Sequence, residues 1–162
     1  MKAVHKMPIE VERKFLTKSA SWRLEVVSES RIVQGYLRAD AQGSVRTRVA
    51  DEGAWLTIKG PSSGMARLEF EYAIPPDEAS QMIELLASGI VEKVRYRLSN
   101  APGIWTVDVF GGANQGLVLL EIEGELVGNI ANLPDWVGEE VTTDPRYYNS
   151  ELSNRPFSTW VA

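Results

Sequence analysis

The 162-residue sequence has no cysteine and only one histidine. Without cysteine, the chain has no thiol for catalysis, no disulfide bond and no cysteine-ligated zinc, and nothing places it outside the cell. We therefore expect a cytoplasmic protein. The single histidine, His5, lies close to the N-terminus, where a lone imidazole is more often exposed to solvent than bound to a ligand.

Long apolar runs are absent as well. No segment approaches the ~20 apolar residues of a membrane-spanning helix, and the start of the chain, MKAVHKMPIE, is too polar for a signal peptide. The 17 Lys and Arg residues are outnumbered by 22 Asp and Glu residues, which gives a formal net charge of −5. That balance argues against a general basic surface for nucleic acid. We expect neither a membrane nor nucleic acid as a partner.

The length of the chain and its turn residues predict one compact domain, residues 1–162, that is dominated by β-structure (α+β class). Extended segments bounded by Gly, Pro, Asn and Ser predict eight strands. These are expected at residues 7–16, 31–39, 43–51, 54–60, 65–74, 91–99, 104–110 and 117–125. Glycine-containing loops such as ADAQGSV and ADEGAW predict antiparallel hairpins, and hence a meander or a barrel.

One clear helix is predicted over residues 75–89, PPDEASQMIELLASG. Pro76 suits its first turn, and Gly89 is expected to cap its C-terminus. An apolar stripe is expected to face the rest of the domain. Its members are Met82, Ile83, Leu85 and Leu86. Two short helices are predicted around residues 19–26 and 145–153.

Charged residues recur at alternate positions in most of the predicted strands. In IEVERKF, residues 9–15, Glu10, Glu12 and Lys14 share one face of an extended chain. The same alternation places further charged side chains on one face of their strands. They are Arg46, Arg48, Lys59, Arg67, Glu69, Glu71, Lys93, Arg95, Arg97, Asp108, Glu121, Glu123 and Glu125. Most strands therefore have an apolar face and a charged face.

Two arrangements explain such strands. In an open sheet the charged face simply meets water, which is the usual reading of a single pair such as Glu-x-Glu. Solvated faces, however, normally mix signs, whereas here several strands are purely basic or purely acidic. In a closed barrel the charged faces would line a central cavity, and like charges on one strand would need an opposite charge between them. Phosphate suits the guanidinium groups, and Mg²⁺ or Mn²⁺ suits the carboxylates, so this arrangement predicts a metal-bound polyphosphate.

The order of these segments resembles the CYTH superfamily, the triphosphate tunnel metalloenzymes. IEVERKF carries the Glu-x-Glu-x-Lys signature, and the family's further segments follow over most of the chain: QGYL, VRTR, LTIKG, RLEFEY, EKVRYRL, VDVF, LEIE and EEVTTDPRYYN. The short length, with GEEVT and RYxN near the end, is similar to that of the small bacterial inorganic triphosphatases. The resemblance implies an eight-stranded antiparallel closed β-barrel with a few flanking helices, whose tunnel binds a triphosphate with a divalent metal.

The resemblance also implies roles for individual residues. The expected phosphate-binding side chains are Lys14, Arg46, Arg48, Lys59, Lys93, Arg95 and Arg97. The expected ligands of metal or of its water are Glu10, Glu12, Asp108, Glu121 and Glu123. Glu69 and Glu71 match an acidic position whose role varies in the family, and they carry less weight.

Two tyrosines need separate comment. Many relatives have a lysine in the string RYKN, and here Tyr148 stands in that place, so Arg146 is the candidate for this phosphate contact. Tyr36 matches a tyrosine that pairs with the signature lysine in some small relatives, here Lys14. An ordinary buried strand tyrosine is an equally good interpretation of Tyr36.

Together the pattern and the resemblance predict hydrolysis of inorganic triphosphate with Mg²⁺ or Mn²⁺. One ion is expected at Glu121 and Glu123 near Asp108, and a second ion or its water at Glu10 and Glu12. The catalytic group is then Glu10, Glu12, Lys14 and Tyr36. Alternatives are a class IV-type adenylyl cyclase, a thiamine or nucleoside triphosphatase, and a polyphosphate-binding protein without turnover. The expected partner is a small-molecule triphosphate, and the protein is expected to be a monomer or a homodimer.

Overall fold

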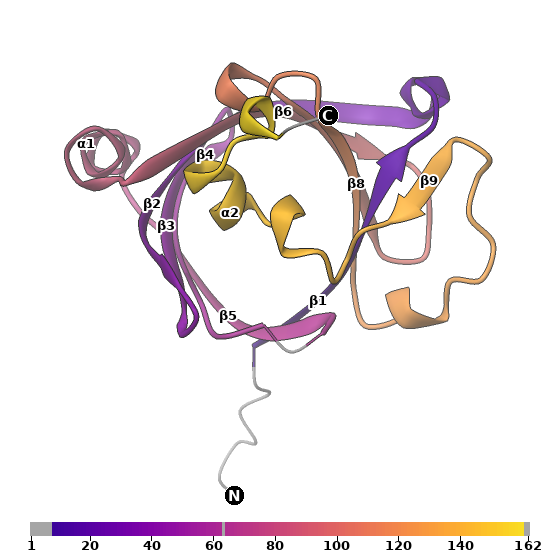
Figure 1. Ribbon diagram of the computed structural model, residues 1–162, viewed down its shortest axis with the longest axis horizontal. Helices are drawn as coiled ribbons and strands as arrows, with labels where there is room; N and C mark the ends of the chain where they lie inside the picture. The colour runs from indigo at the N-terminus through magenta and orange to yellow at the C-terminus, as the bar shows by residue number, and fades with distance from the viewer. Residues whose placement is uncertain (1–7, 63, 161–162) are drawn as a thin grey trace, which may run out of the picture.

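A computed structural model describes residues 8–62 and 64–160 of the chain (Figure 1). Its strands are β1 (Ile9–Thr17), β2 (Val26–Asp40), β3 (Gly43–Ala50), β4 (Gly53–Lys59), β5 (Ala66–Ala73), β6 (Gly89–Leu98), β7 (Ile104–Phe110), β8 (Val118–Glu123) and β9 (Val137–Glu140). Its α-helices are α1 (Pro76–Leu86) and α2 (Asn149–Asn154). Five 3-10 turns are η1 (Ser21–Glu25), η2 (Gly112–Asn114), η3 (Val127–Asn129), η4 (Pro145–Tyr147) and η5 (Phe157–Thr159). His5 lies outside the described residues.

Eight of the strands close into a barrel. The antiparallel order is β5-β4-β3-β2-β6-β7-β8-β1, and β1 then pairs with β5 through Glu10 opposite Arg67 and its two neighbours. The predicted closed barrel is therefore confirmed, and the open sheet with a wet face is wrong. The ninth strand, β9, pairs with Phe15 and Thr17 of β1, beyond the stretch that β5 occupies. Strands β5 and β9 thus share β1 (Figure 1).

All eight predicted strands are present, but some features differ from expectation. Strand β2 begins at Val26, five residues early, because the polar stretch Ser28–Ser30 still pairs with β6. Strand β9 was not predicted, since its four residues, VGEE, have no apolar alternation. Helix α1 ends at Leu86, and Ala87 is extended. Gly89 therefore does not cap the helix but begins β6.

Helix α1 packs on the outside of the barrel against β2 and β3 (Figure 1). Its contact face contains the buried Ala79 and Ile83, four residues apart. Gly35 of β2 allows the close approach, because a Cβ there would lie 3.1 Å from Ile83 Cγ1. Leu85 and Leu86 are 72% and 64% exposed, so the predicted apolar stripe is wrong for these two residues.

The apolar side chains pack in two clusters. One contains Phe15, Trp22, Trp105, Leu120 and Ile122, from strands β1, β7 and β8 and from η1. The other lies where α2 crosses the end of the barrel (Figure 1) and contains Tyr36, Val91, Phe110, Leu119 and Leu152. Hydrophobic packing thus closes one end of the barrel. Within the described residues, no helix is long and apolar enough to cross a membrane.

We predict that Gly89→Ala lowers the stability of the protein by displacing α2. A Cβ at Gly89 would overlap the carbonyl oxygen of Ser153 in α2 and lie 2.9 Å from its carbonyl carbon. Such overpacking costs about 1–3 kcal/mol. The matched control is Gly111→Ala, because a Cβ at Gly111 would meet no atom within 4 Å. Thermal melts of both variants test this, and equal melting temperatures would contradict it.

Candidate active site

A cavity of about 140 Å³ lies inside the barrel and is lined almost entirely by polar side chains. Strand alternation explains this lining, because the charged face of each strand points inward while the apolar face packs outside. The lining residues are Glu10, Glu12, Lys14, Gln34, Tyr36, Ser44, Arg46, Arg48, Lys59, Arg67, Glu69, Glu71, Lys93, Arg95, Glu121, Glu123, Tyr148, Asn149 and Ser150.

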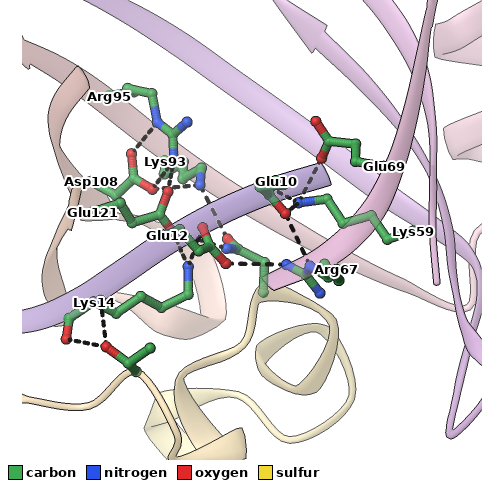
Figure 2. Close-up of polar contacts among 12 residues, drawn as sticks. Glu10, Glu12, Lys14, Lys59, Arg67, Glu69, Lys93, Arg95, Asp108 and Glu121 are labelled. Atoms are coloured by element: carbon green, nitrogen blue, oxygen red, sulfur yellow. Dashed lines mark hydrogen bonds and ion pairs between the residues drawn. The ribbon is translucent and has the colours of Figure 1, made fainter. Parts of the chain in front are cut away.

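An unbroken chain of alternating charges crosses this site (Figure 2). Each side chain in it contacts neighbours of opposite sign, and the contacts come mostly from different strands. In order of contact, the members of this chain of charges are Glu69, Lys59, Glu10, Arg67, Glu12, Lys14, Glu121, Arg95, Asp108 and Lys93. Opposite charges from several strands therefore neutralise each other inside the barrel.

Lys14 is a buried member of this chain of charges, and carboxylates stabilise its positive charge. Its ammonium group donates to Glu121 Oε1 at 2.6 Å and to Glu12 Oε2 at 3.3 Å, and the residue is 3% exposed. Burial lowers the pKa of Lys14, but Glu12 and Glu121 outweigh burial and hold it well above its usual range. Lys14 therefore stays protonated and acts as a hydrogen-bond donor, not as a base.

The expected pairing of Lys14 with Tyr36 is not observed among the described residues. The Tyr36 hydroxyl instead accepts a hydrogen bond from Gln34 Nε2 at 3.4 Å. Burial raises the pKa of Tyr36, and Arg46 opposes this effect without cancelling it. Tyr36 is thus a buried tyrosine that also lines the cavity.

Asp108 orients two cations. It is fully buried, and Arg95 Nε and Lys93 Nζ lie 2.7 and 2.5 Å from its two oxygens. Burial alone would raise the pKa of Asp108, but Arg95 and Lys93 lower it below its usual value. Burial and Arg95 lower the pKa of Lys93 to about 8. Both oxygens are in use and Asp108 is outside the cavity lining, so Asp108 orients Lys93 and Arg95, and its metal contact stays a prediction.

Arg46 and Arg48 of β3 have unused hydrogen-bonding capacity. The Nε of each is buried and has no hydrogen-bond partner among the described residues. The ion pair of Arg48 with Glu71 is long, at 3.3 Å. Burial, followed by the nearby charge of Arg46, lowers the pKa of Arg48. A bound anion would satisfy both unpaired groups.

Glu123 is the counterpart on the acidic side. Its backbone pairs with β1 and β7, but its carboxylate has no hydrogen bond or ion pair to any residue that the structure describes. Partial desolvation, then the negative charges of Glu10, Glu69 and Glu12, raise its pKa to about 7. In the described part of the chain, no three Asp, Glu, His or Cys side chains are grouped tightly enough to hold a metal. The carboxylates whose charges act on Glu123 are nevertheless the kind of oxygen donor that a hard divalent cation takes.

The structure brings most of the predicted residues together at the cavity, with three exceptions. Asp108 is buried outside the lining. Arg97 is exposed, and Arg146 is paired with Asp144 at 2.6 Å on the surface. Neither lines the cavity, whereas Tyr148 does.

Six lining residues were given no role in the site by sequence reasoning. They are Gln34, Ser44, Arg67, Tyr148, Asn149 and Ser150. Arg67 was placed on the charged face of its strand, and its alternation with Glu69 and Glu71 on β5 is the signal for a place in the site. Asn149 and Ser150 could not be found in this way, because they reach the cavity only through the return of α2 across the barrel (Figure 1).

Comparison with known proteins identifies relatives along most of the chain. The CYTH domain model matches residues 8–154. An inorganic triphosphatase of Acetivibrio thermocellus is 40% identical over 152 residues, which cover 93% of this chain and 97% of the relative. An inorganic triphosphatase of Nitrosomonas europaea is 33% identical, with 89% of this chain and 96% of the relative covered.

Solved structures give the same picture. A crystal structure of an inorganic triphosphatase is 29% identical and has a TM-score of 0.64, with 88% of this chain and 96% of that chain covered. A putative adenylyl cyclase from Hippeastrum, described as having a dominant triphosphatase activity, has a TM-score of 0.57. It is 15% identical and covers 74% of this chain and 80% of its own, so it shows a similar fold alone.

We predict that Glu123→Gln stabilises the metal-free protein at pH 8 but not at pH 4. The pKa of Glu123 is about 7 in the folded state against an ordinary 4.5, so folding binds a proton between these values. Wild-type stability therefore falls as pH rises through this window, and the cost is complete above pH 7. Glutamine lacks this titration. Thermal melts at both pH values measure the difference.

The same variant tests the cation site. Mg²⁺ is expected to raise the melting temperature of the wild type at pH 8, because it relieves the repulsion around Glu123, and to raise that of Glu123→Gln much less. If Mg²⁺ stabilises both proteins equally, Glu123 is not a ligand.

Proposed function

The chain belongs to the CYTH domain family, and on this premise we propose that it is an inorganic triphosphatase that uses Mg²⁺ or Mn²⁺. It would hydrolyse tripolyphosphate to pyrophosphate and phosphate. The carrying observation is the charged cavity inside the barrel, where Arg46 and Arg48 have unpaired donors and Glu123 faces other carboxylates. The curated relatives named inorganic triphosphatase, at 40% and 33% identity, support the same activity.

Substrate binding would begin at Arg46 and Arg48. Guanidinium groups hold phosphate oxygens in a fixed, often bidentate geometry, and the Nε of each of these two arginines has no hydrogen-bond partner among the described residues. The remaining cations of the cavity already have carboxylate partners. Phosphate oxygens would compete with those carboxylates, which explains why a cation is needed to take up the displaced negative charge.

Glu10, Glu12, Glu121 and Glu123 are the side chains that would hold the divalent ion. When bound, the ion supplies neutralisation of the phosphate charge and a water of lowered pKa. Glu121 now accepts hydrogen bonds from Lys14 and Arg95. A role for it in metal binding therefore requires that one of these cations turns to the phosphates.

The hydrolysis requires little covalent chemistry from the protein. The oxygen of a water bonds to the terminal phosphorus, the bridging P–O bond breaks, pyrophosphate leaves with the electron pair, and a proton passes to solvent. Fixed cations on several strands hold the phosphates in line for this attack. Lys14, which stays charged, can donate a hydrogen bond to the leaving pyrophosphate.

A cyclase acting on ATP is the second candidate, because the fold is similar to that of the putative adenylyl cyclase from Hippeastrum. A nucleoside needs an apolar slot for its base. The residues that line the cavity are polar almost throughout, and the apolar cluster around Leu152 closes one end. This favours inorganic triphosphate over nucleoside or thiamine triphosphate.

We predict that the purified protein releases phosphate from inorganic triphosphate much faster than from ATP when Mg²⁺ or Mn²⁺ is present. Phosphate release is measured for inorganic triphosphate, thiamine triphosphate, ATP and pyrophosphate, with EDTA as the metal-free control. Faster turnover of ATP, or cyclic AMP as the product, would favour the cyclase instead.

We further predict that Arg48→Ala weakens substrate binding more than it weakens the fold. Loss of a charge-assisted contact to phosphate costs about 1.5–3 kcal/mol, or roughly 10- to 150-fold in KM. The matched control is Arg97→Ala, which removes an exposed arginine of the same barrel. Its KM is expected to stay unchanged. A lower melting temperature with an unchanged KM would show that Arg48 only stabilises the fold through Glu71.

A further inference from the structure

Gln34 of β2 is a cavity residue with an unpaired amide oxygen. The residue is 1% exposed, and its Oε1 has no hydrogen-bond partner among the residues described. Its Nε2 donates to the Tyr36 hydroxyl at 3.4 Å, so one end of the amide is anchored and the other is free. Buried amide oxygens almost always accept a hydrogen bond. A ligand with a proton to donate is therefore expected at Gln34 Oε1.

The surroundings of Gln34 identify this ligand. The strand register places Gln34 opposite Arg48 and Tyr36 opposite Arg46 on β3. These two arginines have the unpaired Nε groups, so a phosphoryl group that they bind would lie beside Gln34. A phosphate oxygen that carries no proton cannot donate to an amide oxygen, whereas water donates two hydrogen bonds. Gln34 is thus suited to hold water next to a bound phosphoryl group.

The charges nearby favour the orientation of the amide with its oxygen toward the cavity. A carbonyl dipole is attracted to the guanidinium groups of Arg46 and Arg48, while an amide NH₂ group in its place would be repelled. The Tyr36 oxygen already accepts from Gln34 Nε2. The hydroxyl proton of Tyr36 is therefore free to turn toward a phosphate oxygen.

We propose that Gln34 is a catalytic residue that positions the attacking water, an inference that rests on the proposed triphosphatase activity. Gln34 Oε1 accepts a hydrogen bond from the water and directs the water's lone pair at the phosphorus held by Arg46 and Arg48. The amide is too weak a base to take the proton, which passes to solvent as the P–O bond breaks. A positioned glutamine orients the attacking water in other phosphoryl-transfer enzymes.

The test compares two variants in steady-state hydrolysis of inorganic triphosphate with Mg²⁺. Gln34→Met keeps the length of the side chain and removes both amide groups. It is expected to lower kcat by about 100-fold while KM changes less than about threefold. Gln34→Glu keeps an acceptor for water, so its kcat is expected to exceed that of Gln34→Met by about tenfold, with a higher KM from the added negative charge.

A matched control and two further measurements separate catalysis from folding. Thr47→Val changes a buried polar residue between the two arginines whose hydroxyl faces Met82 of α1, at 3.5 Å, and it is expected to leave kcat and KM unchanged. Gln34→Met is expected to bind imidotriphosphate, a substrate analogue that resists hydrolysis, as tightly as the wild type. Its melting temperature is expected to be unchanged or higher, because an unpaired buried oxygen has been removed.

Each outcome either supports or contradicts the role proposed for Gln34. If the wild type does not hydrolyse inorganic triphosphate, the proposed function fails and this inference falls with it. If the wild type is active and Gln34→Met keeps its kcat, the inference fails alone. If Gln34→Met binds the analogue more weakly and Gln34→Glu is the worse variant in both constants, the amide nitrogen binds phosphate and the water assignment is wrong. A lowered melting temperature, matched by that of Tyr36→Phe, would assign Gln34 a structural role.

Discussion

The chain of alternating charges inside the barrel is the constraint on which the rest of the structure depends. A closed sheet of eight strands leaves an interior that apolar side chains normally fill. Here the interior contains lysines and arginines that are shielded from water, such as Lys14 at 3% exposure. Such charges are tolerated only when each has an opposite charge and satisfied hydrogen bonds. The continuous contacts from Glu69 to Lys93 meet that condition.

Because charged side chains occupy the interior, most of the hydrophobic core lies on the outer face of the sheet and at one end of the barrel. Phe15, Leu120 and Ile122 alternate with inward charges on β1 and β8, and they pack with η1 and with residues of β9 on the other face of the sheet. At the end of the barrel the alternating positions become apolar, and Leu152 of α2 joins them. Strand β9 and helix α2, which are not part of the closed barrel in Figure 1, therefore supply packing that holds the charged strands in place.

The charge chain also explains how the site can bind a ligand of either sign. Buried ion pairs contribute little net stability, because desolvation offsets most of the Coulomb attraction. Exchanging a carboxylate partner for a phosphate oxygen is consequently less costly than breaking a well-packed apolar contact. Arg46 and Glu123 lie outside the paired chain, and each retains capacity for a ligand of the opposite sign. A metal-bound polyphosphate supplies both charges together.

Sequence by itself determined which residues face inward, because alternation along a strand is a local property with a period of two. It was sufficient for the eight strands, for the closed barrel through the order of the segments, and for most of the cavity lining. It did not determine which carboxylate meets which cation. The pairing of Asp108 with Lys93 and Arg95, for example, could not be read from the alternation along β7.

Only the tertiary structure decided these partners, because they come from strands brought together by register and closure. Arg67 meets Glu10 through the β1–β5 pairing that closes the barrel. Arg97 alternates with Lys93 and Arg95 along β6 but lies outside the cavity lining. The cavity extends along only part of this strand, and alternation does not show where it ends. Asn149 reaches the cavity because α2 folds back over one end. Alternation along one strand contains no information on such distances between segments.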